Sequence, residues 1–304
     1  MGSHDIVDIE YCHIQASVNR QIIKVIRKYI DDFGVEVYDE VKGTGLIRHI
    51  MTRVGFGTGE VMVVIITNGN ELPYKDELVQ MFKENIDGLE SIVQNINTKN
   101  TNVILGKKTV TLYGRDKIVD YIGNLKFNIS ALSFFQVNPV QTQILYDKVL
   151  QYANLTGNET VFDIYCGIGT ISLFLAQKAN GVYGIEMVED AINDARENAK
   201  INNINNVRFY AGKAEEIVPK LYTEGLRADV VVVDPPRKGC EESVLETIVN
   251  MLPERIVYVS CNPATLARDL AYLVDKGYKA VEAQPIDMFA HTAHVETICL
   301  MSKK

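Results

Sequence analysis

From Thr160 onward, short apolar runs alternate with segments of helical periodicity. Five runs have the length of buried strands, namely Val161 to Tyr165, Val182 to Glu186, Val207 to Tyr210, Val230 to Val233 and Arg255 to Val259. The segments with helical spacing that follow them are Thr170 to Lys178, Glu189 to Asn202, Lys213 to Leu221, Val244 to Met251 and Ala264 to Asp275. Strands and helices in this order form a mostly parallel sheet with helices on both faces, so the sequence predicts a doubly wound α/β fold.

The two ends of the chain add further elements. The runs Lys279 to Ala283 and Val295 to Met301 have no helical pattern between them, so we expect them to pair antiparallel at one edge of the sheet. Before Ser130, a helix over Ile14 to Phe33 and strands on either side of the turn Gly55 to Gly59 predict a smaller α/β domain. The predicted domains are therefore residues 5–128 and residues 129–304.

Composition limits the possible partners. The chain has 31 Lys and Arg against 39 Asp and Glu, and a net charge of −8 argues against binding nucleic acid by bulk charge. No apolar run is long enough to span a membrane, so no membrane contact is predicted. The 5 cysteines are scattered through 304 residues, which is typical of reduced thiols and predicts a cytoplasmic protein.

A glycine loop links the first strand to its helix, in Phe162-Asp163-Ile-Tyr165-Cys-Gly167-Ile-Gly169-Thr170. Glu186 ends the next strand, where its carboxylate could accept hydrogen bonds from a ribose, although a strand-end glutamate alone is usually solvated surface. A dinucleotide fingerprint needs a third glycine where this chain has Ser172, which disfavours a nicotinamide oxidoreductase. From Phe162 to the C-terminus, the chain resembles S-adenosylmethionine-dependent methyltransferases with the doubly wound fold.

The segment Asp234-Pro-Pro-Arg237-Lys-Gly239 follows the fourth strand. The two prolines fix the backbone directly after Asp234, which holds the carboxylate at the strand tip. An ordinary turn is the simpler interpretation, whereas in a methyltransferase sheet this position lines the target pocket. Methyltransferases of this superfamily that act on amines usually have an aromatic residue where this chain has Arg237. The segment therefore disfavours methylation of a base amine or a protein amide.

Cys261 lies between the fifth strand and its helix. Ligands bind at this edge of open α/β sheets, and nearby helix N–H groups favour a thiolate, although a cysteine in such a place is more often an inert apolar residue. Beside a methyl donor, a thiolate could add to C6 of a uracil and make C5 nucleophilic enough to take the methyl group.

A base must then remove the C5 proton, and Glu296 is the candidate. Its apolar neighbours Val295 and Ile298 would bury it and raise its pKa, although a solvated glutamate at a strand start is the simpler alternative. His291 and His294 could bind a metal, but two histidines without a further ligand more often form hydrogen bonds, so we predict no metal site.

Together these motifs resemble the RNA uracil-5-methyltransferase family. The matching segments are Phe134-Phe-Gln136-Val-Asn138, Asp163 to Thr170, Asp234 to Gly239, Val259 to Asp269 and His291 to Glu296. The match is dense over residues 130–304 and looser from Val7 to Phe127. Within the family, the chain is most similar to bacterial enzymes that methylate 23S ribosomal RNA, which implies an RNA-facing role for residues 5–128.

The resemblance also implies a role for each matching residue. Cys261 would be the nucleophile and Glu296 the proton acceptor. S-adenosyl-L-methionine would be the methyl donor and S-adenosyl-L-homocysteine its product. The residues expected to bind it are Gln136, Tyr165, Gly167, Thr170, Glu186 and Asp234, of which Gln136 and Asp234 would also lie near the target uracil.

Two features usual in ribosomal members of the family are not found in the sequence. One is an N-terminal β-barrel that binds RNA. The other is a set of cysteines that holds an iron–sulfur cluster, of which only Cys12 has a counterpart here. One thiol cannot hold a cluster, so we expect no cluster and weakened RNA affinity. Met1-Gly2-Ser3-His4 is typical of a cloning remnant, and we expect the natural protein to be longer.

The sequence thus predicts a methyltransferase that forms 5-methyluridine in structured RNA, with 23S ribosomal RNA as the expected substrate and a monomer as the expected state. The target uridine must be unpaired or flipped out to reach Cys261. A non-enzymatic RNA-binding or scaffolding protein on the same fold is the alternative from another class.

Overall fold

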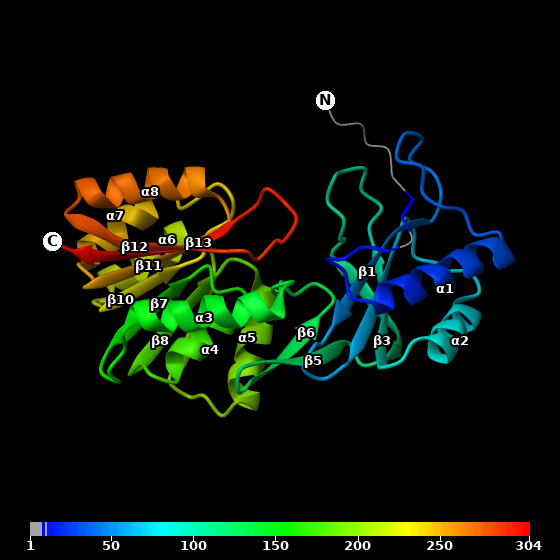
Figure 1. Cartoon of the computed structure of the whole chain (residues 1–304), viewed down its shortest axis with the longest axis horizontal. Helices are drawn as coiled ribbons and strands as arrows, with labels where there is room; N and C mark the ends of the chain where they lie inside the picture. Colours follow the sequence, from blue (N-terminus) through cyan, green and yellow to red (C-terminus); the bar gives the residue numbers. More distant parts are fainter. Residues whose placement is uncertain (1–7, 10) are drawn as a thin grey trace. The chain divides into compact units, whose positions relative to one another are not determined.

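The computed structural model describes residues 8, 9 and 11–304, and the chain forms two compact units (Figure 1). The first unit runs to Asp120 and includes Ile129–Leu132, and the second comprises Tyr121–Asn128 and Ser133–Lys304. The expected cloning remnant, residues 1–4, lies outside the described residues. Each unit encloses its own hydrophobic core.

A seven-stranded sheet with the order β12-β13-β11-β10-β7-β8-β9 forms the centre of the second unit. Its parallel strands are β7 (Thr160–Ile164), β8 (Gly181–Glu186), β9 (Val207–Ala211), β10 (Val230–Val233) and β11 (Arg255–Ser260). The chain runs outward from β7 to β9 and then returns to β10, on the other side of β7. At such a reversal of strand order, open α/β sheets bind ligands beyond the carboxyl ends of their strands.

Helices cover both faces of this sheet (Figure 1). One face carries α3 (Pro139–Ala153), α4 (Thr170–Ala176) and α5 (Glu189–Ile201), and the other carries α6 (Ala214–Thr223), α7 (Glu242–Met251) and α8 (Pro263–Asp275). Because both faces are covered, the central strand β10 is built from four buried valines without alternation. The predicted doubly wound α/β fold is confirmed.

An antiparallel pair completes one edge of the sheet. β12 (Tyr278–Ile286) and β13 (Glu296–Lys303) pair as predicted, and β13 also pairs antiparallel with β11. β13 therefore lies between β11 and β12, although it is the last strand of the chain. Its register, with Thr297 opposite Ser260, places Glu296 beside the carboxyl end of β11.

The first unit is built on a mixed sheet with the order β1-β2-β3-β4. These strands are β1 (Ile47–Val54), β2 (Val61–Thr67), β3 (Leu89–Ile96) and β4 (Lys108–Gly114). β1 and β2 form the predicted hairpin, while β2 and β3 are parallel and are connected through α2 (Lys75–Asn85). α1 (Val18–Phe33) begins at Val18 rather than at Ile14, and Gly34, with a left-handed φ of 63°, ends it.

β5 (Lys117–Ile122) and β6 (Leu125–Ser130) form a separate two-stranded sheet. Two asparagines hold part of β6 within the second unit: Lys126 N–H donates to Asn202 Oδ1 (2.9 Å) and Asn128 N–H donates to Asn198 Oδ1 (2.8 Å).

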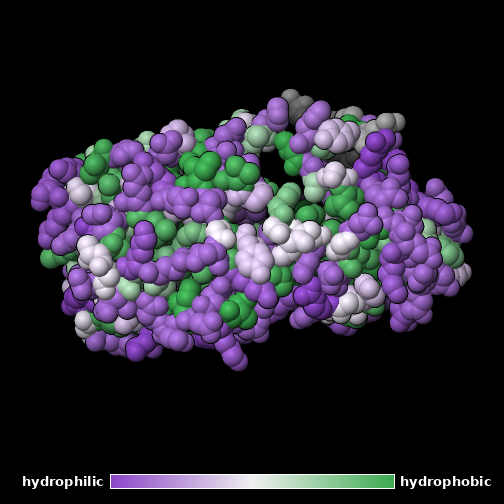
Figure 2. Space-filling view, turned by 60° about the horizontal axis from the view of Figure 1, so that its bottom comes forward, coloured by the Kyte–Doolittle hydropathy of each residue, from purple (hydrophilic) through white to green (hydrophobic). Residues whose placement is uncertain are grey.

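Hydrophilic side chains cover most of the surface shown in Figure 2, and hydrophobic side chains lie among them in small groups. Among the residues that the structure describes, no helix combines the length and apolar character needed to cross a membrane.

Candidate active site

A cavity of about 880 Å³ opens at the carboxyl edge of the second unit's sheet. Residues that follow β7, β8, β10 and β11 line it, together with the first residue of β13. The structure thus brings together seven of the eight site residues predicted from the sequence. These seven are Gln136, Tyr165, Gly167, Glu186, Asp234, Cys261 and Glu296.

Cys261 directly follows β11 and is half-buried in the cavity wall. The next residue, Asn262, caps α8, since its side chain accepts a hydrogen bond from the Ala264 N–H (3.1 Å). Pro263 is the first residue of that helix and cannot extend β11. The strand end and the helix cap together fix the turn that presents the thiol to the cavity.

Two carboxyl groups face Cys261 in the cavity. Burial and the negative charges of Glu296 and Asp234 raise the pKa of the Cys261 thiol, whereas the positive charge of Arg237 acts in the opposite sense. Burial also raises the pKa of Glu296, which is only 3 % exposed, to about 7. The pKa of Asp234 is raised well above its usual range by burial, Glu296 and Asp163. With a pKa of about 7, Glu296 can both hold and release a proton near neutral pH.

Glu186 ends β8 and is held by two backbone amides. The Gly167 N–H donates to Oε2 (3.3 Å) and the Val188 N–H donates to Oε1 (2.9 Å). Tyr165 has a left-handed φ of 71°, and its N–H donates to the Ile185 carbonyl (2.8 Å), which ties the end of β7 to β8. The carboxylate of Glu186 is therefore fixed in place beside the glycine loop.

Ser172 stands where a dinucleotide fingerprint would have its third glycine. The structure shows what it does there, because its hydroxyl donates to Asp163 Oδ2 (2.5 Å) and ties α4 to β7. Both side chains are fully buried, and burial raises the pKa of Asp163 to about 7. The second oxygen of Asp163, Oδ1, has no hydrogen-bond partner among the described residues.

Thr170 is the one predicted site residue that does not line the cavity. It begins α4, and its hydroxyl shares a hydrogen bond with the hydroxyl of Tyr146 (2.7 Å). Both side chains line a small hollow that shares Gln136 and Asp234 with the cavity. A contact between Thr170 and a ligand stays a prediction.

Among the lining residues that were not assigned to the site from the sequence are Phe134, Met187 and Phe289. Phe134 and Met187 are 69 % and 66 % exposed, and Phe289 comes from the segment between β12 and β13. Phe134 lies two residues before Gln136, and Met187 directly follows Glu186. For Phe134 and Met187, the available sequence signal was therefore an apolar side chain close to a predicted polar site residue. Apolar and aromatic side chains suit the face of a nucleobase.

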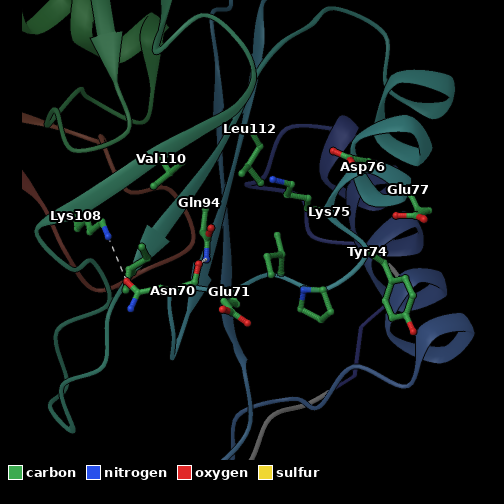
Figure 3. Close-up of a pocket in the computed structure, with 13 residues that line it drawn as sticks. Asn70, Glu71, Tyr74, Lys75, Asp76, Glu77, Gln94, Lys108, Val110 and Leu112 are labelled. Carbon is green, nitrogen blue, oxygen red and sulfur yellow. Dashed lines mark hydrogen bonds between the residues drawn. The ribbon is translucent and has the colours of Figure 1, made fainter.

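A second hollow, of about 890 Å³, lies in the first unit beside β3, β4 and the start of α2 (Figure 3). In its floor, Gln94 Nε2 donates to the Thr67 hydroxyl (2.9 Å), and Lys108 Nζ donates to Asn70 Oδ1 (3.3 Å). The described residues that line it include no cysteine or histidine, and acidic side chains offset its lysines. It therefore offers neither a thiol nor an imidazole, and the cavity of the second unit is the candidate active site.

Metal ligands do not cluster in the part of the chain that the structure describes, where no three Asp, Glu, His or Cys side chains are arranged to hold an ion. His291 and His294 lie between β12 and β13, and the His294 ring meets Phe289 edge-on, with ring centroids 6.3 Å apart. Cys12 is a half-buried free thiol.

Residues 23–304 match the protein family described as tRNA (uracil-5-)-methyltransferase. A protein of Clostridium tetani named as an uncharacterized RNA methyltransferase is 55 % identical over 300 residues, which cover 99 % of this chain and 65 % of that protein. One of Caldanaerobacter subterraneus with the same designation is 53 % identical over 301 residues, covering 99 % of this chain and 67 % of that protein. The chain thus spans about two thirds of the length of these curated relatives.

A solved structure has a similar fold over almost the whole chain. It is the tRNA (uracil-54, C5)-methyltransferase of Pyrococcus abyssi in complex with S-adenosyl-L-homocysteine, with a TM-score of 0.81 and 31 % sequence identity. The similarity covers 98 % of this chain and 70 % of that protein. The resemblance drawn from the sequence motifs is therefore confirmed at the level of the family.

Proposed function

Because the chain belongs to the tRNA (uracil-5-)-methyltransferase family, we propose that it transfers a methyl group from S-adenosyl-L-methionine to C5 of a uridine in structured RNA. The observation that carries the proposal is that Cys261, Asp234 and Glu296 line one cavity together with Gly167 and Glu186. Methylation of a base carbon through a covalent adduct needs a nucleophile, a proton acceptor and a place for the methyl donor. This cavity contains residues suited to each of these tasks.

The residues present fit S-adenosyl-L-methionine. Glu186, already held by two amides, would accept hydrogen bonds from the ribose hydroxyls. A Cβ added to Gly167 would meet no atom within 4 Å, so the loop leaves space for a ligand there. The carboxyl groups of Asp163, which is buried, and Asp234, which is half-buried, suit a nearby cation, which would lower their raised pKa values. When bound, the cofactor supplies an electrophilic methyl group on a positively charged sulfur.

The chain's own residues would carry the remaining steps. The Cys261 thiolate would add to C6 of the uracil, and the displaced electron pair would make C5 nucleophilic toward the methyl group. Glu296 would then accept the C5 proton, while the electrons of that C–H bond restore the C5–C6 double bond and expel the thiolate. With a pKa of about 7, Glu296 suits proton transfer at neutral pH. Gln136 and Asp234 would orient the uracil edge through hydrogen bonds.

For the RNA, 23S ribosomal RNA remains our prediction, and transfer RNA is the second candidate. The motifs favour the first, and the Pyrococcus abyssi protein, whose name specifies uracil-54 of tRNA, favours the second. With a net charge of −8, recognition must depend on local contacts rather than on bulk attraction to phosphate. Since either RNA would be a cytoplasmic substrate, we propose that the activity is cytoplasmic.

The first test is methylation in vitro. The chain, Cys261→Ala and Glu296→Gln are incubated with S-adenosyl-L-methionine and with unmodified 23S or transfer RNA transcripts. 5-Methyluridine is then mapped by mass spectrometry of nuclease fragments. We expect 5-methyluridine with the unchanged chain and no turnover with Cys261→Ala. Glu296→Gln should turn over about 10²–10⁴-fold more slowly and accumulate a covalent protein–RNA adduct that survives denaturing electrophoresis.

Each alternative has its own outcome in the same experiments. An active Cys261→Ala variant would end the thiol mechanism. A methylated base amine in place of 5-methyluridine, formed also after alkylation of Cys261, would support amine methylation. RNA binding without any S-adenosyl-L-methionine binding in isothermal titration would support a non-enzymatic role.

A further inference from the structure

Arg237 lies in the loop that follows β10 and is anchored to the turn that carries Cys261. Its carbonyl oxygen accepts two hydrogen bonds, one from Asn262 Nδ2 (3.0 Å) and one from the Thr265 hydroxyl (3.2 Å). Asn262 directly follows Cys261, and Thr265 belongs to the first turn of α8. The backbone of Arg237 is therefore held in a fixed place beside the thiol-bearing turn.

The guanidinium group of Arg237 has no carboxylate partner in the described part of the chain, in contrast to its neighbours. Lys238 pairs with Glu241, and Arg268 pairs with Asp269 (2.7 Å). The exposed side chain of Arg237 lines the same cavity as Cys261. Its charge is therefore not neutralised by an acidic side chain and can act on the cavity.

Charged groups from three parts of the second unit act on Cys261. Glu296 from β13 and Asp234 from the end of β10 disfavour the thiolate, and so does burial. Arg237 is the side chain that favours it, and the backbone N–H of Cys261 itself acts in the same sense. Since only the thiolate is a strong nucleophile, the proposed addition to C6 needs a group that offsets the carboxyl groups.

We propose that Arg237 is a positioning residue that favours the thiolate form of Cys261 and opposes the effect of the two carboxyl groups. The proposal rests on the function assigned to Cys261 above. It also gives a reason for an arginine at the place where amine methyltransferases have an aromatic residue. A permanently charged guanidinium can stabilise an anion here at any pH at which the enzyme works.

The test follows the alkylation of Cys261 by iodoacetamide as a function of pH, with the modified peptide quantified by mass spectrometry. Arg237→Gln should move the pH profile of Cys261 upward and slow its alkylation at neutral pH by about tenfold, which corresponds to a pKa change of about one unit. Arg237→Lys should restore most of the rate. Lys238→Gln is the matched control, since Lys238 is the adjacent cation and is paired with Glu241.

The free thiol of Cys12, which lies in the first unit, serves as an internal reference in every sample. An unchanged Cys261 profile in Arg237→Gln, or the same shift in Lys238→Gln, would overturn the proposal. If Arg237→Gln does not fold, the unchanged chain is treated with two reagents instead. A nearby cation should speed the reaction of anionic iodoacetate relative to that of neutral iodoacetamide. The ratio of these two rates should therefore be higher at Cys261 than at Cys12. An iodoacetate-to-iodoacetamide rate ratio that is equal at the two thiols or higher at Cys12 would also overturn the proposal. The assay contains no RNA, so a failure of the proposed RNA methylation is distinguishable from a failure of this inference.

Discussion

At the scale of single residues, Glu296 is the group whose protonation connects stability with the proposed chemistry. Its side chain is 3 % exposed, and burial alone raises its pKa to about 7. In the unfolded chain a glutamate has a pKa of about 4.3. The folded state therefore favours the protonated carboxyl group, and ionisation of Glu296 costs folding free energy.

The sign of the pH dependence follows from that difference. Below about pH 4.3, both states hold the proton and there is no cost. The cost grows as the pH rises and is complete above about pH 7, where it reaches about 4 kcal/mol. We expect Glu296→Gln to increase the free energy of unfolding by up to that amount at about pH 8 and to leave it nearly unchanged at about pH 4.

Urea unfolding at the two pH values measures this effect. The exposed Glu246→Gln serves as the control in the same unit and should show no such difference between the two pH values. A loss of stability at the higher pH in Glu296→Gln would mean that the carboxylate has a stabilising partner and that burial does not control its ionisation.

At the scale of elements, the glycine loop depends on close packing as well as on backbone freedom. Gly169 has a φ of +81°, and an added Cβ would lie 2.9 Å from Phe209 Cζ and 3.1 Å from Ala195 Cβ. Gly225 has a similar φ of +92° but nothing within 4 Å of an added Cβ. Substitutions at Gly169 and Gly225 can therefore distinguish the energetic cost of a left-handed backbone conformation from the cost of a steric clash.

Alanine substitutions at the two positions should differ accordingly. Gly225→Ala should lose about 1–2 kcal/mol of unfolding free energy, the cost of a left-handed conformation for an L-residue. Gly169→Ala should lose a further 1–3 kcal/mol or so, because the ring of Phe209 and the loop must move apart. Urea unfolding measures both variants. Equal losses would show that the loop relaxes without strain and that close packing does not explain Gly169.

Local sequence patterns predicted some of the elements, whereas non-local pairing and packing could not be predicted from the sequence. The alternation of apolar runs and helices predicted the parallel strands, because each element has a local pattern. The insertion of β13 between β11 and β12 is a non-local pairing that leaves no local pattern, yet it brings Glu296 to Cys261. The hydrogen bond from Ser172 to Asp163 and the left-handed φ of Tyr165 likewise depend on packing between β7, β8 and α4. Motifs therefore predicted seven residues that line the cavity, and packing between elements distant in the sequence determines how they meet.

At the scale of the whole molecule, each unit has a core of its own. Tyr29 and Phe82 are fully buried in the core of the first unit, and Phe162 and Tyr258 in that of the second. All the residues that line the candidate active site belong to the second unit. A ligand of this site is therefore expected to stabilise the second unit directly.

Hydrogen exchange read by mass spectrometry tests this expectation. A ligand present at about 100 times its Kd adds about 2.7 kcal/mol to the stability of the state that binds it, so S-adenosyl-L-homocysteine should slow exchange through unfolding of the second unit by about 100-fold. Peptides that contain β10 should show this protection, and peptides that contain β2 should exchange at an unchanged rate. Both strands are buried along their whole length, so burial does not account for a difference between them. Equal protection of both would show that the two units unfold together, and no protection in β10 would remove the cofactor from the cavity to which we assign it.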